Sequence, residues 1–330
     1  KIVITQGRDL YEYRKNFCCY FVLMIKKGIV YCTTGSIHRI KSEGQFYDCR
    51  IKGKFRIKGI KSTNPLAVGD KVSFAIEPRK DAEGIIISIE TRQNYIVRKS
   101  VNLSKQTHII AANIDQVFLM ITLKTPKTFP AFIDRFLVTA QAYKINVVLL
   151  FNKIDLYNIE DLRAIRNLNG VYQKIGYECH EVVATDLKTL TVIDSKMKGK
   201  VSMFCGHSGV GKSTLVNSLS PGLNLKTGSV SQQKQQGQHT TTFAQMFDLG
   251  KSRIIDTPGI KGFGIVDIKP EELSGYFTEF AALKSSCRFN NCLHTSEPNC
   301  AIKDAIKQGE IAPSRYKSYL QLLEEDSLYR

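Results

Sequence analysis

One stretch of the sequence combines glycines, a lysine and hydroxyl residues in the spacing that proteins use to bind phosphate. The stretch GHSGVGKST, residues 206–214, matches G-x-x-x-x-G-K-S/T and follows the apolar, strand-like run VSMFC. Its glycines allow backbone N–H groups to turn toward phosphate oxygens, Lys212 can reach the β and γ phosphates, and Ser213 can supply a ligand to Mg²⁺. The sequence therefore predicts a nucleoside triphosphate site with Lys212 in a catalytic role.

Two further motifs point to a second Mg²⁺ ligand and to the base. DTPG, residues 256–259, ends another apolar run, which predicts Asp256 near Mg²⁺ and the Gly259 N–H near a γ-phosphate. NKID, residues 152–155, also follows an apolar run, and the Asp155 carboxylate can accept hydrogen bonds from two guanine donors that adenine lacks. GTP is therefore favoured over ATP. The predicted nucleotide-binding residues are Asn152, Lys153, Ile154, Asp155, Gly206, His207, Ser208, Gly209, Val210, Gly211, Lys212, Ser213, Thr214 and Gly259.

The order of these motifs differs from that of most GTPases, in which the phosphate loop comes first. Here the guanine motif precedes the phosphate loop and DTPG. A sheet depends on which strands are neighbours in space, so joining the original termini and cutting the chain elsewhere can preserve the site. The chain resembles the circularly permuted GTPases, and with its flanking segments it is similar to the ribosome small-subunit-dependent GTPase A family, RsgA. That resemblance implies that ATD, residues 184–186, forms the last guanine-contacting loop.

The polar stretch between the phosphate loop and DTPG ends in HTTTF, where a GTPase has its first switch, a loop ordered by γ-phosphate and Mg²⁺. One of its threonines is expected to bind Mg²⁺: Thr241 is preferred, and Thr240 and Thr242 are the alternatives. The resemblance implies that His239 orients the attacking water, because Ile260 stands where other GTPases use glutamine. The alternative is that His239 is an exposed loop histidine that contacts RNA.

A second group of residues has the spacing of a metal site. The segment CRFNNCLHTSEPNC brings Cys287, Cys292, His294 and Cys300 within fourteen residues. Three thiolates and one imidazole match a tetrahedral Cys₃His site for Zn²⁺, and no ligand position is left for water, so the expected ion is structural and one per chain. The pattern also matches the zinc pattern of the RsgA family. The alternative is a chance cluster of buried cysteines.

The elements around these motifs predict an α/β fold that includes a small barrel. Residues 28–100 alternate apolar and polar positions in short strands, which favours a basic β-barrel of the OB type. Residues 101–266 alternate apolar runs with helical stretches, as in a parallel sheet covered on both faces. This part is predicted to be the circularly permuted GTPase domain, with a helix near residues 131–143.

Residues 267–330 are predicted to form a zinc-binding helical domain. The stretches PEELSGYFTEFAAL and PSRYKSYLQLLEE each begin with a proline, which is favourable in the first turn of a helix, and the cysteine cluster lies between them. At the other end of the chain, the first methionine is Met24. Residues 1–27 are therefore expected to be a non-native or flexible extension.

Charge indicates the kind of partner. The formal net charge is +17, and between Gly28 and Ile110 fifteen Lys or Arg residues stand against seven Asp or Glu residues. Such an excess favours a polyanion, nucleic acid before membrane, although a merely soluble basic surface is the alternative. The resemblance implies the small ribosomal subunit and its rRNA as partners, with GTP hydrolysed to GDP during late subunit maturation and stimulated by the subunit. The rival is a GTP-binding RNA scaffold with negligible hydrolysis.

Cysteine usage and hydropathy give the expected compartment. Nine cysteines are an odd number without a disulfide framework, which favours a reducing cytoplasm. The longest apolar run, FCCYFVLMI, has about half the length of a membrane span. We therefore expect a cytoplasmic monomer with no membrane segment.

Overall fold

The chain folds into two units, each built from parts that are distant in sequence. One unit comprises residues 1–114 and 237–258, and the other comprises residues 115–236 and 259–330. The structure is a computed structural model, and it describes residues 10–13, 21–51, 65–76, 84–99, 107–223, 244–256 and 268–328.

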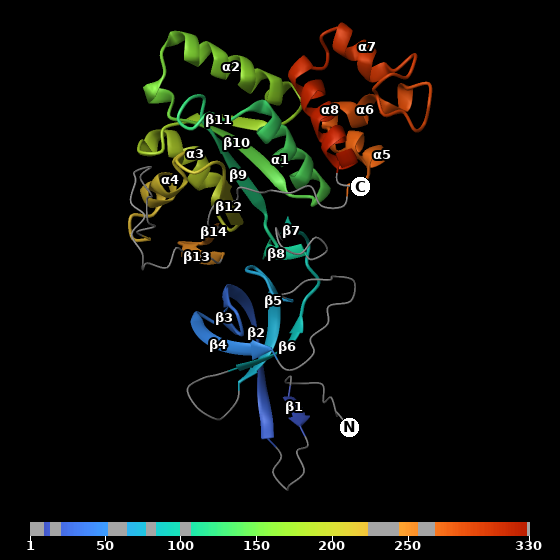
Figure 1. Cartoon of the computed structure of the whole chain (residues 1–330). Coiled ribbons are helices and arrows are strands. Elements are labelled where there is room, and N and C mark those ends of the chain that lie inside the picture. The colour runs from blue at the N-terminus through green and yellow to red at the C-terminus, as the bar shows by residue number, and fades with distance from the viewer. Residues whose placement is uncertain are drawn as a thin grey trace. The chain divides into compact units, whose positions relative to one another are not determined.

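The first unit contains a closed barrel of five strands, drawn in blue in Figure 1. These are β2 (Phe21–Thr34), β3 (Ile37–Ser42), β4 (Gln45–Ile51), β5 (Lys71–Ile76) and β6 (Gly84–Ile89). Their order is β2-β3-β4-β6-β5, and pairing of β2 with β5 closes the ring. Val30, Ile40, Phe74 and Ile86 fill the interior. The predicted barrel of the OB type is confirmed.

Strand β2 begins earlier than the sequence suggested. Its first part pairs with β1 (Leu10–Tyr13), and Lys26 and Lys27 pair with Phe74 and Ser73 of β5. Gly28 follows at a close approach, where an added Cβ would lie 2.4 Å from a methyl group of Ile40. Residues 21–27, assigned from the sequence to an extension, therefore belong to the long strand β2.

Two hairpins complete the described part of the first unit. Strands β7 (Tyr95–Lys99) and β8 (Thr107–Ala112) pair with each other, and so do β13 (Gln245–Leu249) and β14 (Ser252–Asp256). Strand β13 joins the barrel, because Gln245 pairs with Cys32 of β2. The Asp248 carboxylate accepts a hydrogen bond of 2.6 Å from the Tyr31 hydroxyl and another from the Lys41 ammonium. The second hairpin is thus tied to the barrel by backbone and side-chain contacts.

The second unit contains a parallel sheet in the order β11-β10-β9-β12. Its strands are β9 (Gln116–Ile121), β10 (Asn146–Asn152), β11 (Glu178–Val182) and β12 (Val201–Cys205). Strand β9 is buried at every position, as the apolar run that follows its polar first residue, Gln116, predicts. The helices are α1 (Pro130–Ala142), α2 (Ile159–Lys174), α3 (Leu187–Met197) and α4 (Lys212–Leu219). Because crossovers between parallel strands are right-handed as a rule, the strand order β11-β10-β9-β12 assigns α1 and α2 to one face of the sheet and α3 to the other.

The C-terminal helices belong to this second unit and lie beside α1 (Figure 1). They are α5 (Pro270–Leu273), α6 (Thr278–Leu283), α7 (Ala301–Lys307) and α8 (Pro313–Leu328), with 3₁₀ turns η2 (Ser274–Tyr276) and η3 (Lys284–Ser286). Their core includes Phe277, Phe280 and Tyr319, and it extends to Val138 of α1. Within the described ranges, no helix combines the length and apolar composition that a membrane span needs.

Candidate functional site

The phosphate loop joins β12 to α4 and contains three glycines with positive φ. Gly206, Gly209 and Gly211 have φ of 139°, 83° and 106°, a region that other residues rarely adopt. Space is also limiting: an added Cβ would lie 2.5 Å from the Met120 carbonyl oxygen at Gly206 and 2.5 Å from Asn152 Nδ2 at Gly211. Both conformation and close packing therefore require glycine at these two positions.

Lys212 is the first residue of α4, and its ammonium is held at the loop. Its Nζ donates to the carbonyl oxygens of Gly206 at 2.9 Å and His207 at 2.8 Å. Ser213 and Thr214 follow in the first helical turn and are partly buried. A cation, glycine-rich backbone and a helix N-terminus thus meet in one loop, which is the arrangement that binds phosphate.

The guanine motif is bonded directly to the phosphate loop. Asn152 is buried at the end of β10; its Nδ2 donates to the Val210 carbonyl at 2.7 Å, and its Oδ1 accepts from the Ala184 N–H at 3.0 Å. Lys153 has a left-handed φ of 66°, and its Nζ donates to the Gly209 carbonyl at 2.8 Å. These bonds assemble the loops around residues 152–155, 184–186 and 206–214 into one site.

Other predicted residues of this site lie partly inside and partly outside the residues that the structure describes. Ile154 and Asp155 lie in the 3₁₀ turn η1 (Ile154–Leu156), where Asp155 is exposed and its carboxylate is accessible to a base. Asp256 is the last residue of β14 in the first unit. His239, Thr241 and Gly259 lie outside the residues that the structure describes.

Phe132 is a contact of the phosphate loop that sequence reasoning missed. Its ring, in the first turn of α1, lies against the His207 imidazole with ring centroids 4.0 Å apart and planes inclined by 33°. Burial, and next the positive charge of Lys212, lower the pKa of His207, so that its ring is neutral at neutral pH. The apolar pattern of the helix gave no sign of this contact, because Phe132 and His207 are far apart in sequence.

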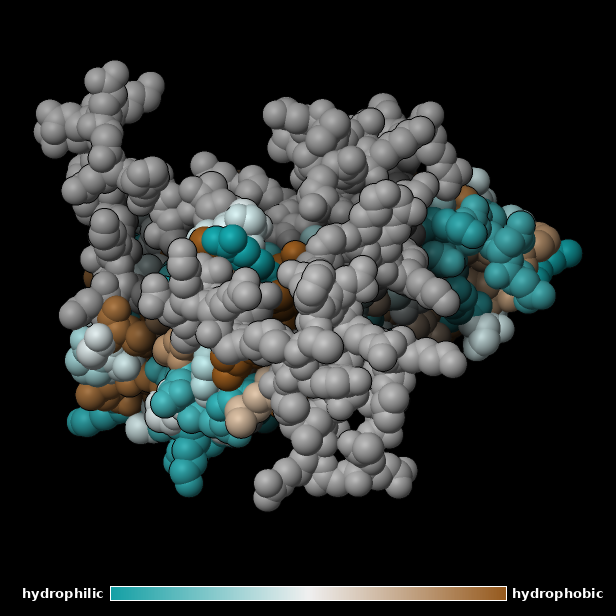
Figure 2. Space-filling model, turned by 90° about the horizontal axis from the view of Figure 1, so that it is seen from below, coloured by the Kyte–Doolittle hydropathy of each residue, from teal (hydrophilic) through white to brown (hydrophobic). Residues whose placement is uncertain are grey.

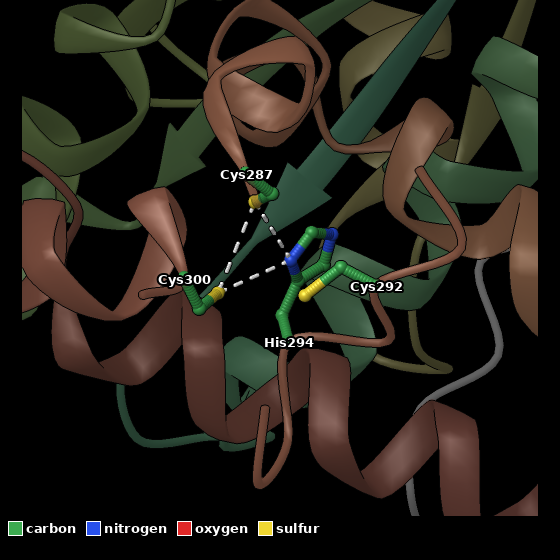
Figure 3. A group of neighbouring side chains, drawn as sticks. All are labelled: Cys287, Cys292, His294 and Cys300. Atoms are coloured by element: carbon green, nitrogen blue, oxygen red, sulfur yellow. Dashed lines mark hydrogen bonds between the residues drawn. The ribbon is translucent and has the colours of Figure 1, made fainter. Parts of the chain in front are cut away.

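The cysteine cluster forms as predicted, in the loops between η3 and α7 (Figure 3). The donor atoms of Cys287, Cys292, His294 and Cys300 all lie within 4.8 Å of one another. Cys287 Sγ is 3.6 Å from His294 Nδ1 and 4.0 Å from Cys300 Sγ, and His294 Nδ1 is 3.3 Å from Cys300 Sγ. Tetrahedral ligands of Zn²⁺ lie roughly 3.5–3.8 Å apart. The donor set and its spacing therefore fit zinc.

Neighbouring side chains fix the backbone of the loop that carries His294. The Glu297 carboxylate accepts from the N–H groups of Leu293 and Thr295, both at 2.8 Å. The hydroxyls of Tyr316 and Tyr319 on α8 donate to the carbonyls of His294 and Leu293, at 2.7 and 2.9 Å. Helix α8 thereby supports the metal site, a role that the cysteine spacing alone does not predict.

Two family models match the chain. Residues 89–266 match the model described as RsgA GTPase, and residues 27–86 match the model described as RsgA N-terminal domain. The chain belongs to the RsgA GTPase family. Its relatives include two proteins named "Small ribosomal subunit biogenesis GTPase RsgA". The one from Christiangramia forsetii is 60% identical over 308 residues, which are 92% of this chain and 98% of that protein. The one from Flavobacterium johnsoniae is 60% identical over 302 residues, or 91% and 93% of the two chains.

Solved structures of RsgA-like proteins share the fold. YjeQ from Thermotoga maritima superposes with a TM-score of 0.74 at 34% identity, covering 92% of this chain and 98% of that one. YloQ, described as a circularly permuted GTPase, superposes with a TM-score of 0.72 at 29% identity, covering 93% and 96%. The motif order predicted as a circular permutation is thus the order of the RsgA fold.

Proposed function

We propose that this RsgA-family GTPase binds the small ribosomal subunit during late maturation and hydrolyses GTP to GDP, with hydrolysis stimulated by the subunit. The observation that carries the proposal is the hydrogen-bonded frame around Asn152. Its side chain bridges the phosphate loop at Val210 and the loop at Ala184. A frame of this kind holds the base-reading and phosphate-binding groups in one geometry, which lets a single nucleotide bind both.

Each motif has a distinct role in this proposal. The Asp155 carboxylate accepts hydrogen bonds from the guanine base, and Lys212 binds the β and γ phosphates. Ser213, Asp256 and Thr241 would hold Mg²⁺, which would neutralise charge on the phosphates. His239 orients the attacking water. The phosphate loop excludes bulk water from the reacting oxygens, because its backbone N–H groups take the place of solvent.

The C-terminal cluster holds one structural Zn²⁺ in this account. Cys287, Cys292, His294 and Cys300 supply four ligands, which complete a tetrahedron without water. A closed site supports folding rather than chemistry, because no position is open to a substrate. The ion would therefore stabilise the C-terminal helices, whose core includes three of its ligands, and we propose that these helices contact the subunit.

The partner is proposed from charge and from the names of the relatives. The excess of eight positive charges between Gly28 and Ile110, fifteen minus seven, suits the phosphate backbone of rRNA. In the first unit Phe46 is 52% exposed on β4, and such an aromatic ring can stack on an unpaired base. On the face drawn in Figure 2, the described residues mix hydrophilic and hydrophobic patches. We propose a monomer acting in the cytoplasm.

A substitution of Asp155 tests whether this residue selects the guanine base of the nucleotide. In Asp155→Asn the side-chain amide replaces one acceptor by a donor, so GTP turnover should fall by about a hundredfold or more, while xanthosine triphosphate, whose base reverses the donor pattern, should become the better substrate. Turnover of both nucleotides is measured by phosphate release. Asp194→Asn, at an exposed position of α3 outside these loops, is the control and should retain the preference for GTP. Unchanged GTP turnover in Asp155→Asn would show that the base is read elsewhere.

A further inference from the structure

Helix α1 contacts the phosphate loop on one side and the C-terminal helices on the other. Phe132 faces the loop, whereas Asp134, two positions later, faces α8. With 3.6 residues per turn these two side chains lie about 200° apart around the helix. One rigid element therefore stands between the nucleotide site and the zinc-binding segment.

On the loop side, the Phe132 ring packs against His207, whose backbone carbonyl binds the Lys212 ammonium. Phe132 and His207 are both partly buried, and their rings lie 4.0 Å apart between centroids. The carbonyl of the same His207 accepts the hydrogen bond from Lys212 Nζ at 2.8 Å. Aromatic contacts of this kind contribute about 0.5–1.5 kcal/mol beyond burial. Displacement of the Phe132 ring would thus shift the His207 carbonyl that accepts the hydrogen bond from Lys212.

On the other side, α1 is held by a buried ion network. Asp134 is fully buried and accepts from Arg315 at 2.7 Å and from the Tyr172 hydroxyl at 2.8 Å. Arg315, 1% exposed, also donates to Glu279 of α6 at 2.7 Å, and its guanidinium lies 4.6 Å from the centre of the Phe277 ring. Opening such a network would leave charge buried without a partner, so separation of α1 from α8 is strongly unfavourable.

We propose that Phe132 is a positioning residue for the phosphate loop and that α1 couples this loop to the C-terminal segment. The inference rests on the proposed nucleotide site. Phosphate oxygens that bind Lys212 compete with the Gly206 and His207 carbonyls, so the His207 peptide and its ring must adjust. The Phe132 ring transfers that adjustment to α1, and the Asp134–Arg315 pair transfers it to α8. Linkage makes the effect mutual: a partner that docks on the C-terminal segment changes nucleotide affinity by the same factor.

Hydrogen exchange of α8 with and without GDP tests the coupling on the full chain. In the wild type, GDP should slow exchange around residues 315–319 by about fivefold or more, the lower end of typical allosteric couplings. In Phe132→Ala, GDP should still bind, but this slowing should be lost. Phe132→Tyr keeps the ring and should restore it. Phe129→Ala is the matched control, because that neighbouring ring is 56% exposed and should leave the response unchanged.

A second variant removes the other ring of the contact between Phe132 and His207. His207→Ala removes the partner ring but keeps the backbone carbonyl, so it should lose the α8 response as Phe132→Ala does; it also keeps the test decisive if Phe132→Ala folds poorly. Failure of the wild type to bind GDP would refute the proposed function. GDP binding without any change in α8 exchange, or a full response in both ring variants, would refute the coupling through α1.

Discussion

Asn152 is the residue whose contacts hold the loops of the proposed nucleotide site together. Its amide satisfies the buried Val210 carbonyl and Ala184 N–H, and each such group left without a partner costs about 1–3 kcal/mol. Asn152→Ala should therefore weaken GDP binding, measured by calorimetry, by about tenfold or more. The matched control is Asn158→Ala, which removes the N-terminal cap of α2 and should lower stability by about 1 kcal/mol without changing affinity. Equal GDP affinity in both variants would show that the hydrogen bonds of Asn152 do not support nucleotide binding.

The sequence predicted which residues belong to the site better than it predicted the contacts between them. The four-residue motif NKID identified Asn152, and the glycine spacing identified the phosphate loop, because these types are needed locally. The bond from Asn152 to Val210 spans 58 residues, and the ring contact of Phe132 with His207 has no sequence signature. Such contacts depend on how strands and helices pack, which residue type alone does not specify.

Among the structural elements, the C-terminal helices and the metal cluster share one core. Cys287, Cys292 and Cys300 pack in the same buried group as Phe280 and Tyr319. Cys292→Ser should therefore lose zinc and loosen these helices while much of the parallel sheet stays folded. Metal analysis and limited proteolysis provide the readout, with about one zinc expected per wild-type chain. Cys179→Ser on β11 is the control and should retain the metal. Intact C-terminal helices in a metal-free wild type would contradict a structural role for the ion.

The hairpin β13–β14 gives a prediction about pH. Burial would raise the pKa of Asp248, but the hydrogen bonds from Lys41 and Tyr31 outweigh burial and lower it. A carboxyl with a lowered folded pKa adds stability above its unfolded pKa, about 3.9, and this stability is lost as the pH falls through the folded value. Asp248→Asn should reduce the free energy of unfolding by about 1 kcal/mol or less near pH 7, because the group is partly exposed.

The pH test compares urea denaturation of this variant and the wild type at several pH values. The difference between them should shrink as the pH falls from about 7 toward about 3. Asp48→Asn is the control: it breaks a more exposed pair, with Arg39, within the barrel and should have the smaller effect near pH 7. A difference for Asp248→Asn that grows on acidification would contradict the sign.

Element prediction succeeded where hydrophobic periodicity was strong. QVFLMI forms the fully buried β9, and the helix expected near residues 131–143 is α1 at Pro130–Ala142. The stretch PEELSGYFTEFAAL is instead divided into α5, η2 and α6, with Phe277 extended at the break, where it is buried in the C-terminal core. Tertiary burial of one aromatic residue thus overrides local helix propensity.

At the scale of the whole molecule, each unit contains segments that are distant in sequence. The phosphate loop and guanine motif belong to the second unit, whereas Asp256 belongs to the first, on a hairpin tied to the basic barrel. The predicted boundaries at residues 100 and 266 follow changes of composition, and they stay predictions. Compositional boundaries do not reveal that the hairpin β13–β14 associates with the barrel, because that association depends on strand pairing.

Stimulation of GTP hydrolysis by the small ribosomal subunit is the part of the proposed function that a turnover assay tests directly. The direct measurement is multiple-turnover phosphate release by the full chain, with and without purified subunits, at low and moderate salt. We expect subunits to raise turnover about tenfold or more, equivalent to about 1.4 kcal/mol of activation free energy, with Lys212→Ala inactive in both conditions. Stimulation should weaken as salt competes for phosphate contacts. Turnover that is the same with and without subunits, in a chain that binds both GTP and the subunit, would contradict the account.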